Sequence, residues 1–459
     1  MRFLAALAVI NAAPPPAFYS TWPRGTPSAT WPDGPFLGNG VTGVVVGGGP
    51  GSVVLYFGLS GFWSTGYGAN SSMPPLRGPG SAFPGCPAPN CMITVGLTLA
   101  TVEVSSSALA SKTATWNATF DLAGASATVD LTDGSPAYGL RLNVLVSATT
   151  QLTILELVNI GTQPLPFNVT TAGNGNTLDV PITGGCVGGS GAAAPCPPAG
   201  GGALPGHWLT KAADPRGAGA LHITAALASR VLACAGCQVG ASAPYEATVN
   251  HTAWDGGGPV ATRTRGTATA ALLAPRGGAT IALSAASSRD PGVAPDDPLV
   301  VALRAVAATT AGAVPALKAA HSAWWSAYFG KSGVSLDPAA ADVEAFWWTA
   351  VYALGAGSRA GGVTMDLWSP WRTTDYSSWR SNPTMESVKW ARPEAHRAPR
   401  PLSHARPPSA ATISRHCTLA RWPPTTLRCC SPTTTLLQTR WPPAVPQRRP
   451  RRLAAPACT

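Results

Sequence analysis

Residues 31–64 read WPDGPFLGNGVTGVVVGGGPGSVVLYFGLSGFWS, a glycine-rich turn region that leads directly into a run of Val, Leu, Tyr and Phe. Asn39 stands between two glycines, where the backbone is expected to need a positive φ. A glycine-rich loop can also bind phosphate, but the Lys and Ser or Thr of a Walker loop are missing here and no helical pattern follows. The stretch therefore predicts a tight turn that opens a β domain.

Outward from this stretch, short segments of alternating apolar and polar residues follow one another, separated by Gly, Pro and Asn. This period of two is typical of antiparallel strands with one buried face. So many strands without helices between them predict a large β-sandwich. Residues 184–206, rich in Gly, Ala and Pro, are expected to form a surface loop. The expected strands are 53–58, 93–104, 113–122, 126–131, 140–146, 152–161, 166–171, 220–233, 261–274 and 279–287.

Near residue 313 the period of the apolar residues changes to that of a helix. One helix is expected over 316–331 and a second over 342–360, with Asp337 or Asp342 as a cap for the second. The expected apolar faces are Leu317, Trp324, Trp325 and Phe329 on the first helix, and Phe346, Trp347, Val351 and Leu354 on the second.

The net positive charge of the chain lies in residues 391–459. This segment holds 12 Arg, no Lys and a single acid, Glu394, so its net charge of +11 equals that of the whole chain. It also has 13 Pro, no Gly and no hydrophobic period, which predicts disorder. A basic arm that binds nucleic acid or another polyanion is one interpretation. We favour out-of-frame translation of GC-rich sequence, beginning near residue 380 or 391.

The N-terminal segment and the cysteines favour secretion. Residues 1–15 begin with a basic residue, an apolar run and small residues, like a short signal peptide. No other segment has the roughly 18 apolar residues that cross a bilayer. An even set of closely spaced cysteines is typical of disulfides in an oxidising compartment, and a redox or metal Cys-x-x-Cys is the alternative for the last pair. The pairs are Cys86 and Cys91, Cys186 and Cys196, and Cys234 and Cys237. Glycosylation sequons stand at Asn70, Asn117, Asn168 and Asn250.

Two stretches carry a resemblance to a known family. Residues 31–64 resemble the start of the N-terminal β-sandwich of glycoside hydrolase family 95 and related six-hairpin glycosidases. The matching residues are Leu37, Gly38, Asn39, Gly40 and Gly43, followed by Phe62 and Trp63. Residues 344–379 resemble the same family's passage into its (α/α)6 barrel. The matching residues there are Phe346, Tyr352, Ser358, Arg359, Gly361, Gly362, Leu367, Trp368, Trp371, Asp375 and Trp379.

The resemblance implies an aromatic-lined sugar subsite made of Trp368, Trp371, Asp375 and Trp379. It does not supply a catalytic set. Where the family has an Asp-Tyr-Thr-x-Asn-x-Asn segment, this chain has 381–387, SNPTMES, and the family's general acid belongs to barrel helices farther along. Glycoside hydrolysis usually needs two opposed carboxyl groups. The nearby acids are Asp366, Asp375 and Glu386, none of which we assign as the general acid. We therefore expect the chain as written to be inactive.

No histidine spacing suggests a metal site, and no cofactor is expected. His321, beside Trp324 on the expected first helix, is interpreted as a packed residue. The implied activity is hydrolysis of an α-L-fucoside or a related deoxy- or galacto-configured sugar. The expected partner is an oligo- or polysaccharide, and no nucleic acid is expected to bind. The expected location is outside the cell, in the endomembrane lumen or in the cell wall. A non-enzymatic carbohydrate-binding or cell-surface β-sandwich is the alternative. The expected domains are a signal peptide 1–15, a β-sandwich 16–312, a helical linker 313–335, the start of a barrel 336–390 and a tail 391–459.

Overall fold

A computed structural model of the chain describes its β-rich middle and the helices that follow. The described residues are 34–64, 95–111, 113–174, 182–187, 193–194, 206–212, 223–252, 259–290, 293, 297–331, 333–359 and 370–372. They belong to the first of two units of the chain, Met1–Arg397. The expected signal peptide 1–15 and the tail 391–459 lie outside the described residues.

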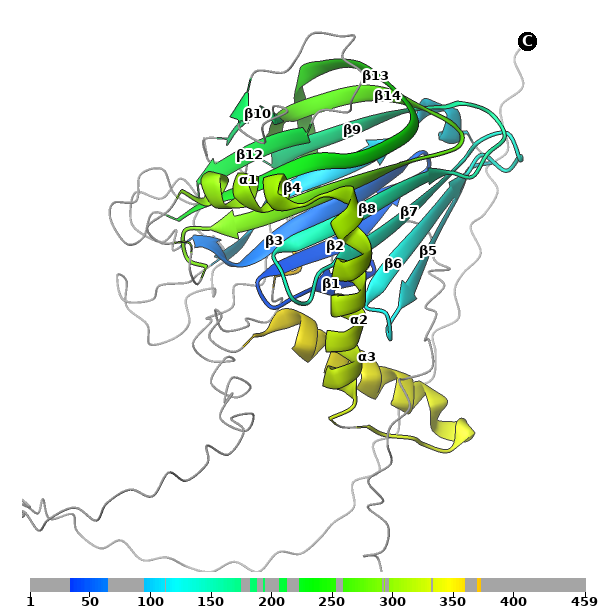
Figure 1. The fold of residues 1–459 in the computed structure, drawn as a ribbon, viewed down its shortest axis with the longest axis vertical. Coiled ribbons are helices and arrows are strands. Elements are labelled where there is room, and N and C mark those ends of the chain that lie inside the picture. The colour runs from blue at the N-terminus through cyan, green and yellow to red at the C-terminus, as the bar shows by residue number, and fades with distance from the viewer. Residues whose placement is uncertain are drawn as a thin grey trace, which may run out of the picture. The chain divides into compact units, whose positions relative to one another are not determined.

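Fourteen strands form one sheet in which all strand pairs are antiparallel (Figure 1). The strands are β1 Phe36–Gly38, β2 Thr42–Gly49, β3 Ser52–Ser64, β4 Val95–Ser105, β5 Thr115–Asp121, β6 Ser126–Thr132, β7 Gly139–Val146, β8 Leu152–Asn159, β9 Leu165–Asn174, β10 Ile182–Val187, β11 Ala193–Ala194, β12 Gly206–Ala212, β13 Thr224–Thr252 and β14 Pro259–Ser287.

The sheet curls because β14 belongs to two groups of strands. One edge of β14 pairs with β9 over Thr264–Leu273 and then with β8 over Gly278–Ser284. The strands β1, β2, β3, β4 and β9 make one half of the sheet, and β5 to β8 make the other. A shared core contains side chains from both halves, among them Leu55 and Val102 from the first and Leu142 from the second. The expected antiparallel β-sandwich is therefore confirmed, as one curled sheet rather than two separate ones.

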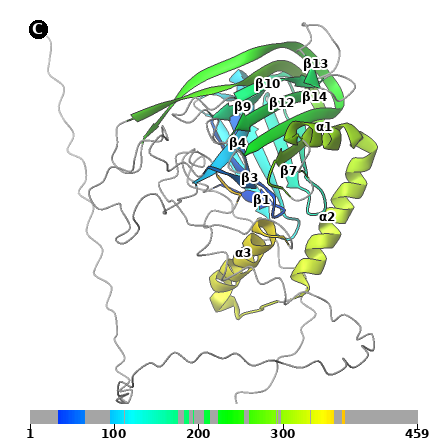
Figure 2. The ribbon, with the colours of Figure 1, turned by 90° about the vertical axis from the view of Figure 1, so that its left-hand side faces the viewer.

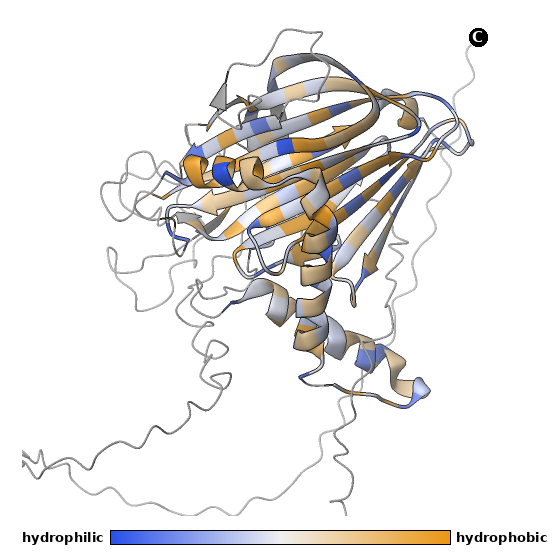
Figure 3. Cartoon of the chain, viewed as in Figure 1, coloured by the Kyte–Doolittle hydropathy of each residue, from blue (hydrophilic) through white to orange (hydrophobic). Residues whose placement is uncertain are grey.

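The alternating pattern that predicted the strands is visible along them (Figure 3). In β6, for example, buried and half-buried residues alternate without interruption. Two predictions need correction. The expected strands 261–274 and 279–287 form the single strand β14. The backbone is irregular at Arg276, where φ is 60°, but the strand continues through this residue. The expected surface loop 184–206 contains the edge strand β11 and part of β10, which pairs with β12.

In the described part of the chain, three α-helices follow the strands: α1 Pro298–Ala308, α2 Val314–Phe329 and α3 Ala341–Gly357. The first was not predicted from the sequence, because its short run of Val and Ala resembles a strand. Asp297 caps it by accepting a hydrogen bond from the backbone N–H of Leu299 at 2.9 Å. The apolar side of α1 then packs on β13 and β14, with Val306 fully buried.

The helices expected over 316–331 and 342–360 are confirmed as α2 and α3. Figure 2 shows α2 along the side of the sheet and α3 below β1. Asp337 caps the 3-10 turn Pro338–Ala340 just before α3, accepting from the N–H of Ala339 at 2.9 Å. The predicted apolar face of α3 is wrong in part: Phe346 is 75% exposed, and Trp348 and Tyr352 are the large side chains that are buried. Because α3 is apolar on more than one side, its periodicity does not identify the buried face.

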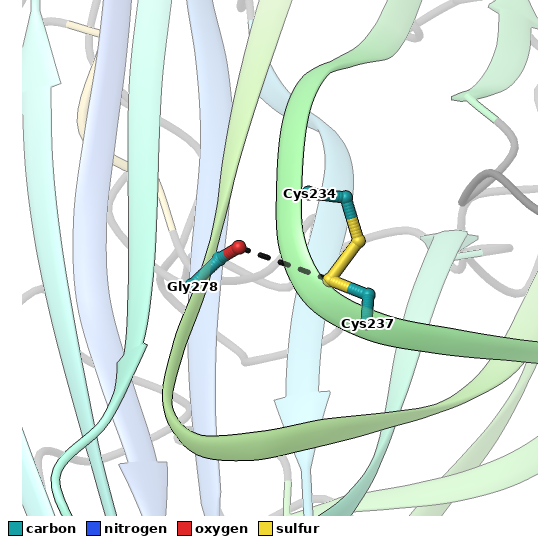
Figure 4. The surroundings of a disulfide bond; sticks show 3 residues. All are labelled: Cys234, Cys237 and Gly278. Atoms are coloured by element: carbon teal, nitrogen blue, oxygen red, sulfur yellow. Dashed lines mark hydrogen bonds between the residues drawn. A yellow bond between two sulfur atoms is a disulfide. The ribbon is translucent and has the colours of Figure 1, made fainter.

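Of the three predicted disulfide pairs, Cys234–Cys237 is bonded in β13. The sulfur atom of Cys237 lies 3.8 Å from the carbonyl oxygen of Gly278 (Figure 4). Cys186 is also disulfide-bonded, whereas Cys86, Cys91 and Cys196 lie outside the described residues.

The sequon residues Asn117 and Asn168 are exposed on β5 and β9. Asn250 lies in β13, and Asn70 lies outside the described residues. Among the described helices, none crosses a membrane by itself on length and hydropathy; α1 and the segment Ala311–Phe329, bent by 81° to each other, pass that test only as a pair.

Candidate functional site

The two stretches that carry the family resemblance lie against each other, although about 300 residues separate them in the chain. Three hydrogen bonds join them, two from side chains to backbone carbonyls and one between backbone groups. The hydroxyl of Tyr352 donates to the carbonyl of Phe36 at 3.0 Å, and the indole N–H of Trp371 donates to the carbonyl of Leu37 at 2.8 Å. The N–H of Gly40 donates to the carbonyl of Ala356 at 2.6 Å. We call this region the junction: residues 36–43 and 58 on the sheet, and 352–359 and 370–372 after it.

The glycines of the junction are needed because backbone approaches backbone there. A Cβ on Gly38 would lie 2.5 Å from the carbonyl oxygen of Ala356, and one on Gly58 would lie 2.0 Å from that of Pro370. A Cβ on Gly43 would lie 2.7 Å from the ring of Pro370. The chain itself fills the space where the side chains of these residues would lie. This close packing accounts for the glycine-rich stretch without a bound phosphate.

The tight turn uses its residues differently from what the sequence suggested. The positive φ belongs to Gly40, at 83°, and not to Asn39. The side chain of Asn39, 6% exposed, accepts from the N–H groups of Val41 and Thr42 at 3.1 and 2.9 Å. Its amide donates to the carbonyls of Ser147 and Thr150 at 3.1 and 2.9 Å. Asn39 thus ties the turn to the loop between β7 and β8.

An aromatic cluster fills the space under the junction. The ring of Phe36 lies 4.7 Å from that of Trp371 and 5.6 Å from that of Tyr352, and Tyr352 lies 5.0 Å from Phe120 in an edge-on arrangement. Burial raises the pKa of the Tyr352 phenol well above its usual range, so the hydroxyl stays protonated as the donor to Phe36. Edge-on aromatic pairs of this kind fix ring positions as well as burying area.

Arg359 is a half-buried cation at the edge of the junction. Its guanidinium stacks on the ring of Trp324 at 3.9 Å, and its Nη1 donates to the carbonyls of Gly355 and Ser358. The Nη2 atom is buried and has no hydrogen-bond partner. Burial lowers the pKa of Arg359 to about 10, so the group remains charged at neutral pH. The ring of Tyr328 stacks parallel to Trp324, with their centroids 5.2 Å apart.

The structure describes one of the four predicted sugar-binding residues. Trp371 is half-buried, its indole N–H is used by Leu37 and its ring contacts Phe36, so it helps to hold the junction. Its sugar-binding role remains a prediction. Trp368, Asp375 and Trp379 lie outside the described residues, as do Asp366 and Glu386.

Sequence reasoning missed the hydrogen-bonding role of Asn39 and the stacking of Arg359 on Trp324. The signal for the first was an amide placed between two glycines. No signal existed for the second, because the two residues are 35 positions apart in a part of the chain with no shared period.

Comparisons with known proteins add a partial similarity. No protein-family model matches the chain, and no curated protein matches it. A solved structure described as "Putative kojibiose phosphorylase from human microbiome" aligns with a TM-score of 0.46 and 10% identity, over 73% of this chain and 41% of that one. The chain thus spans less than half of that protein's length. A similarity of this degree assigns neither a family nor an activity.

Proposed function

We propose that this chain contains the supporting β-sandwich and the junction of a glycan-acting protein of the six-hairpin glycosidase type. The observation that supports this is the junction itself: the two stretches with the family resemblance contact each other through Tyr352, Trp371 and the glycines of β1 to β3. The ligand would be an oligo- or polysaccharide containing α-L-fucose or a related galacto-configured sugar.

We expect binding without hydrolysis. The segment 381–387 lacks the Asn-x-Asn pattern that the resemblance requires, so no water-positioning group is assigned. Trp371 is a half-buried residue of the junction, and a Trp ring left partly open is suited to stacking on the face of a sugar. Binding of neutral glycans that depends on Trp371 would therefore be the chain's function in the form given by its sequence.

The experiment is calorimetric titration of the purified chain with fucosylated and galacto-configured oligosaccharides. Wild-type protein is expected to bind at least one of them, and Trp371→Ala to bind it about tenfold more weakly, in line with about 1–3 kcal/mol for a ring stacked on a ligand. Trp347→Ala is the matched control, since Trp347 is a half-buried Trp of α3 whose ring partner is Trp348. An unaltered affinity in Trp371→Ala, or no binding at all, contradicts the proposal.

Turnover is measured in parallel with aryl α-L-fucosides and galactosides. Release of the aryl group that disappears on replacing Asp366, Asp375 or Glu386 would show that the expectation of inactivity is wrong, while leaving the glycan ligand in place.

We also propose that the protein is secreted or enters the endomembrane lumen or cell wall. The exposed sequons at Asn117 and Asn168 and the disulfide Cys234–Cys237 support this. Glycosidase digestion followed by peptide mass mapping of the protein from its own cells would detect glycans on these two asparagines; unmodified peptides at both sites would count against secretion.

A further inference from the structure

His321 connects α2 to two turns of the sheet. The residue is fully buried. Its Nδ1 lies 3.1 Å from the backbone nitrogen of Ala148, in the loop between β7 and β8. Its Nε2 lies 2.9 Å from the carbonyl oxygen of Gly124, in the turn between β5 and β6. One imidazole ring therefore bridges a helix and both turns at this end of the second half of the sheet.

The two partners determine the protonation state of the ring. The backbone N–H of Ala148 can only donate, so Nδ1 must be the unprotonated acceptor. The carbonyl of Gly124 can only accept, so Nε2 must carry the hydrogen. His321 is consequently neutral, in the Nε2–H tautomer. A second proton on Nδ1 would remove the bond to Ala148 and place two N–H groups against each other.

The charged groups around His321 do not favour its protonation. On the C-terminal side of α3, Arg359 lies close enough to lower its pKa, and on α2 itself Lys318 is paired with Glu156 of β8 at 2.6 Å. In the turn between β5 and β6, Asp121 accepts from the N–H of Gly124 at 3.0 Å. The loop 147–150 contributes no titratable side chain. Burial is the main cause that lowers the pKa of His321, and the backbone carbonyl contact partly opposes it.

The bridge is also linked to the junction. Asn39 donates to the carbonyls of Ser147 and Thr150, and His321 accepts from the N–H of Ala148. The loop 147–150 is therefore hydrogen-bonded both to the junction and to α2. We propose that His321 is an acid-sensitive latch: in its neutral form it fastens α2 and the loop 147–150 to the sheet, and its protonation releases the helix and loosens the junction. This inference does not depend on the proposed glycan ligand.

The direction of the effect follows from linkage. A histidine whose pKa is lower in the folded than in the unfolded state binds more protons when unfolded. Its contribution to stability is complete above the ordinary pKa of 6.5 and is lost as the pH falls below that value toward the folded pKa. The latch is therefore closed at neutral pH, and its closed form loses stability as the pH falls below about 6.5, as it does in acidic secretory compartments or cell walls.

The test combines two measurements on the full chain. Nitrogen NMR of the histidine rings at about pH 7.5 should show His321 as the neutral Nε2–H tautomer; the other tautomer or a charged ring would overturn the proposal without any variant. Hydrogen exchange, corrected for the intrinsic rate, is then compared between about pH 7.5 and about pH 5. The amide of Ala148 and those of α2 should lose protection by up to about tenfold for each pH unit below 6.5, while amides of β7 stay protected.

His321→Gln is the matched variant, because a neutral amide can accept from Ala148 and donate to Gly124 at every pH. It should abolish the pH dependence of the local exchange. His207→Gln is the control: His207 is also buried, with a pKa lowered by burial to about 4, but it bonds the hydroxyls of Thr171 and Thr269, which can donate or accept. This variant should leave the exchange of α2 unchanged. Equal pH dependence in wild type and His321→Gln would overturn the latch.

Discussion

At the scale of single residues, Asn39 illustrates how one side chain can organise a turn. Its side-chain oxygen accepts two hydrogen bonds and its NH2 group donates two, all of them with backbone groups. Both donor hydrogens and both acceptor lone pairs of the amide are therefore used. An Asn is required because the site needs an acceptor toward Val41 and Thr42 and a donor toward the loop 147–150. Neither Asp nor Leu offers both. The residue therefore acts through structure, at a position where the family resemblance drew attention to it.

Asn39→Ala is expected to lower the free energy of unfolding by roughly 2–4 kcal/mol, because it leaves buried backbone groups without partners. Urea denaturation at neutral pH measures the loss. Asn117→Ala is the control, since Asn117 is exposed on β5 and its replacement should change stability by less than about 0.5 kcal/mol. A similar, small effect of both variants would show that the Asn39 bonds are not formed in solution.

At the scale of elements, β2 and β3 present glycines wherever the segment after α3 crosses them. Gly43 of β2 and Gly58 of β3 lie directly opposite each other in the register. Both lie against Pro370. The pair makes a flat place on the sheet for the crossing backbone. Glycine weakens a strand, so two facing glycines in otherwise good strands indicate a close approach by another segment.

Gly43→Ala is expected to cost about 1–3 kcal/mol through crowding against Pro370 and to displace residues 370–372. Thermal denaturation and the fluorescence of the Trp residues report the two effects. The control lies on the same strand: an alanine Cβ at Gly49 would meet no atom within 4 Å, so Gly49→Ala should be nearly neutral. If Gly43→Ala is as stable as Gly49→Ala, the crossing segment does not lie where the structure places it.

At the scale of the whole described part, α2 and α3 share the core of the sheet. Trp325, Phe329, Trp348 and Tyr352 belong to the same buried cluster as the strands of both halves. The junction adds hydrogen bonds to β1 from Tyr352 in α3 and from Trp371 after it. The division into a sandwich 16–312 and a later helical part therefore describes the order of the chain, whereas the packing joins the two.

One cooperative unfolding transition is accordingly expected for this part of the protein. Far-ultraviolet circular dichroism, which follows strands and helices, and tryptophan fluorescence, to which Trp residues of the helices and the junction contribute, should give the same midpoint. Tyr352→Phe, which removes the bond to Phe36, should lower both midpoints together. Two separate transitions, with only the fluorescence midpoint moved by Tyr352→Phe, would mean that the helices unfold independently of the sheet.

Most of the long strands and two of the helices could be predicted because local pattern determines them, whereas β1, β2, β10, β11 and β12 were not among the expected strands. Alternation in segments such as SATVDL at 126–131 reflects one buried face, and that pattern is present before any folding. The helix α1 and the continuous strand β14 could not be predicted, because a short apolar run fits a helix or a strand equally well and a Gly-Gly pair can bend a strand without ending it.

The sequence by itself determined the antiparallel β class, the change to helices near residue 313 and the two glycine- and aromatic-rich stretches of the junction. Only the tertiary structure decided that those stretches meet and that Pro370 packs against Gly43 and Gly58. It also decided that Arg359 stacks on Trp324 and that His321 bridges two turns. The physical reason is range. Periodicity records which face of an element avoids water, whereas these contacts join residues 35 or more positions apart and depend on how the sheet and helices pack together.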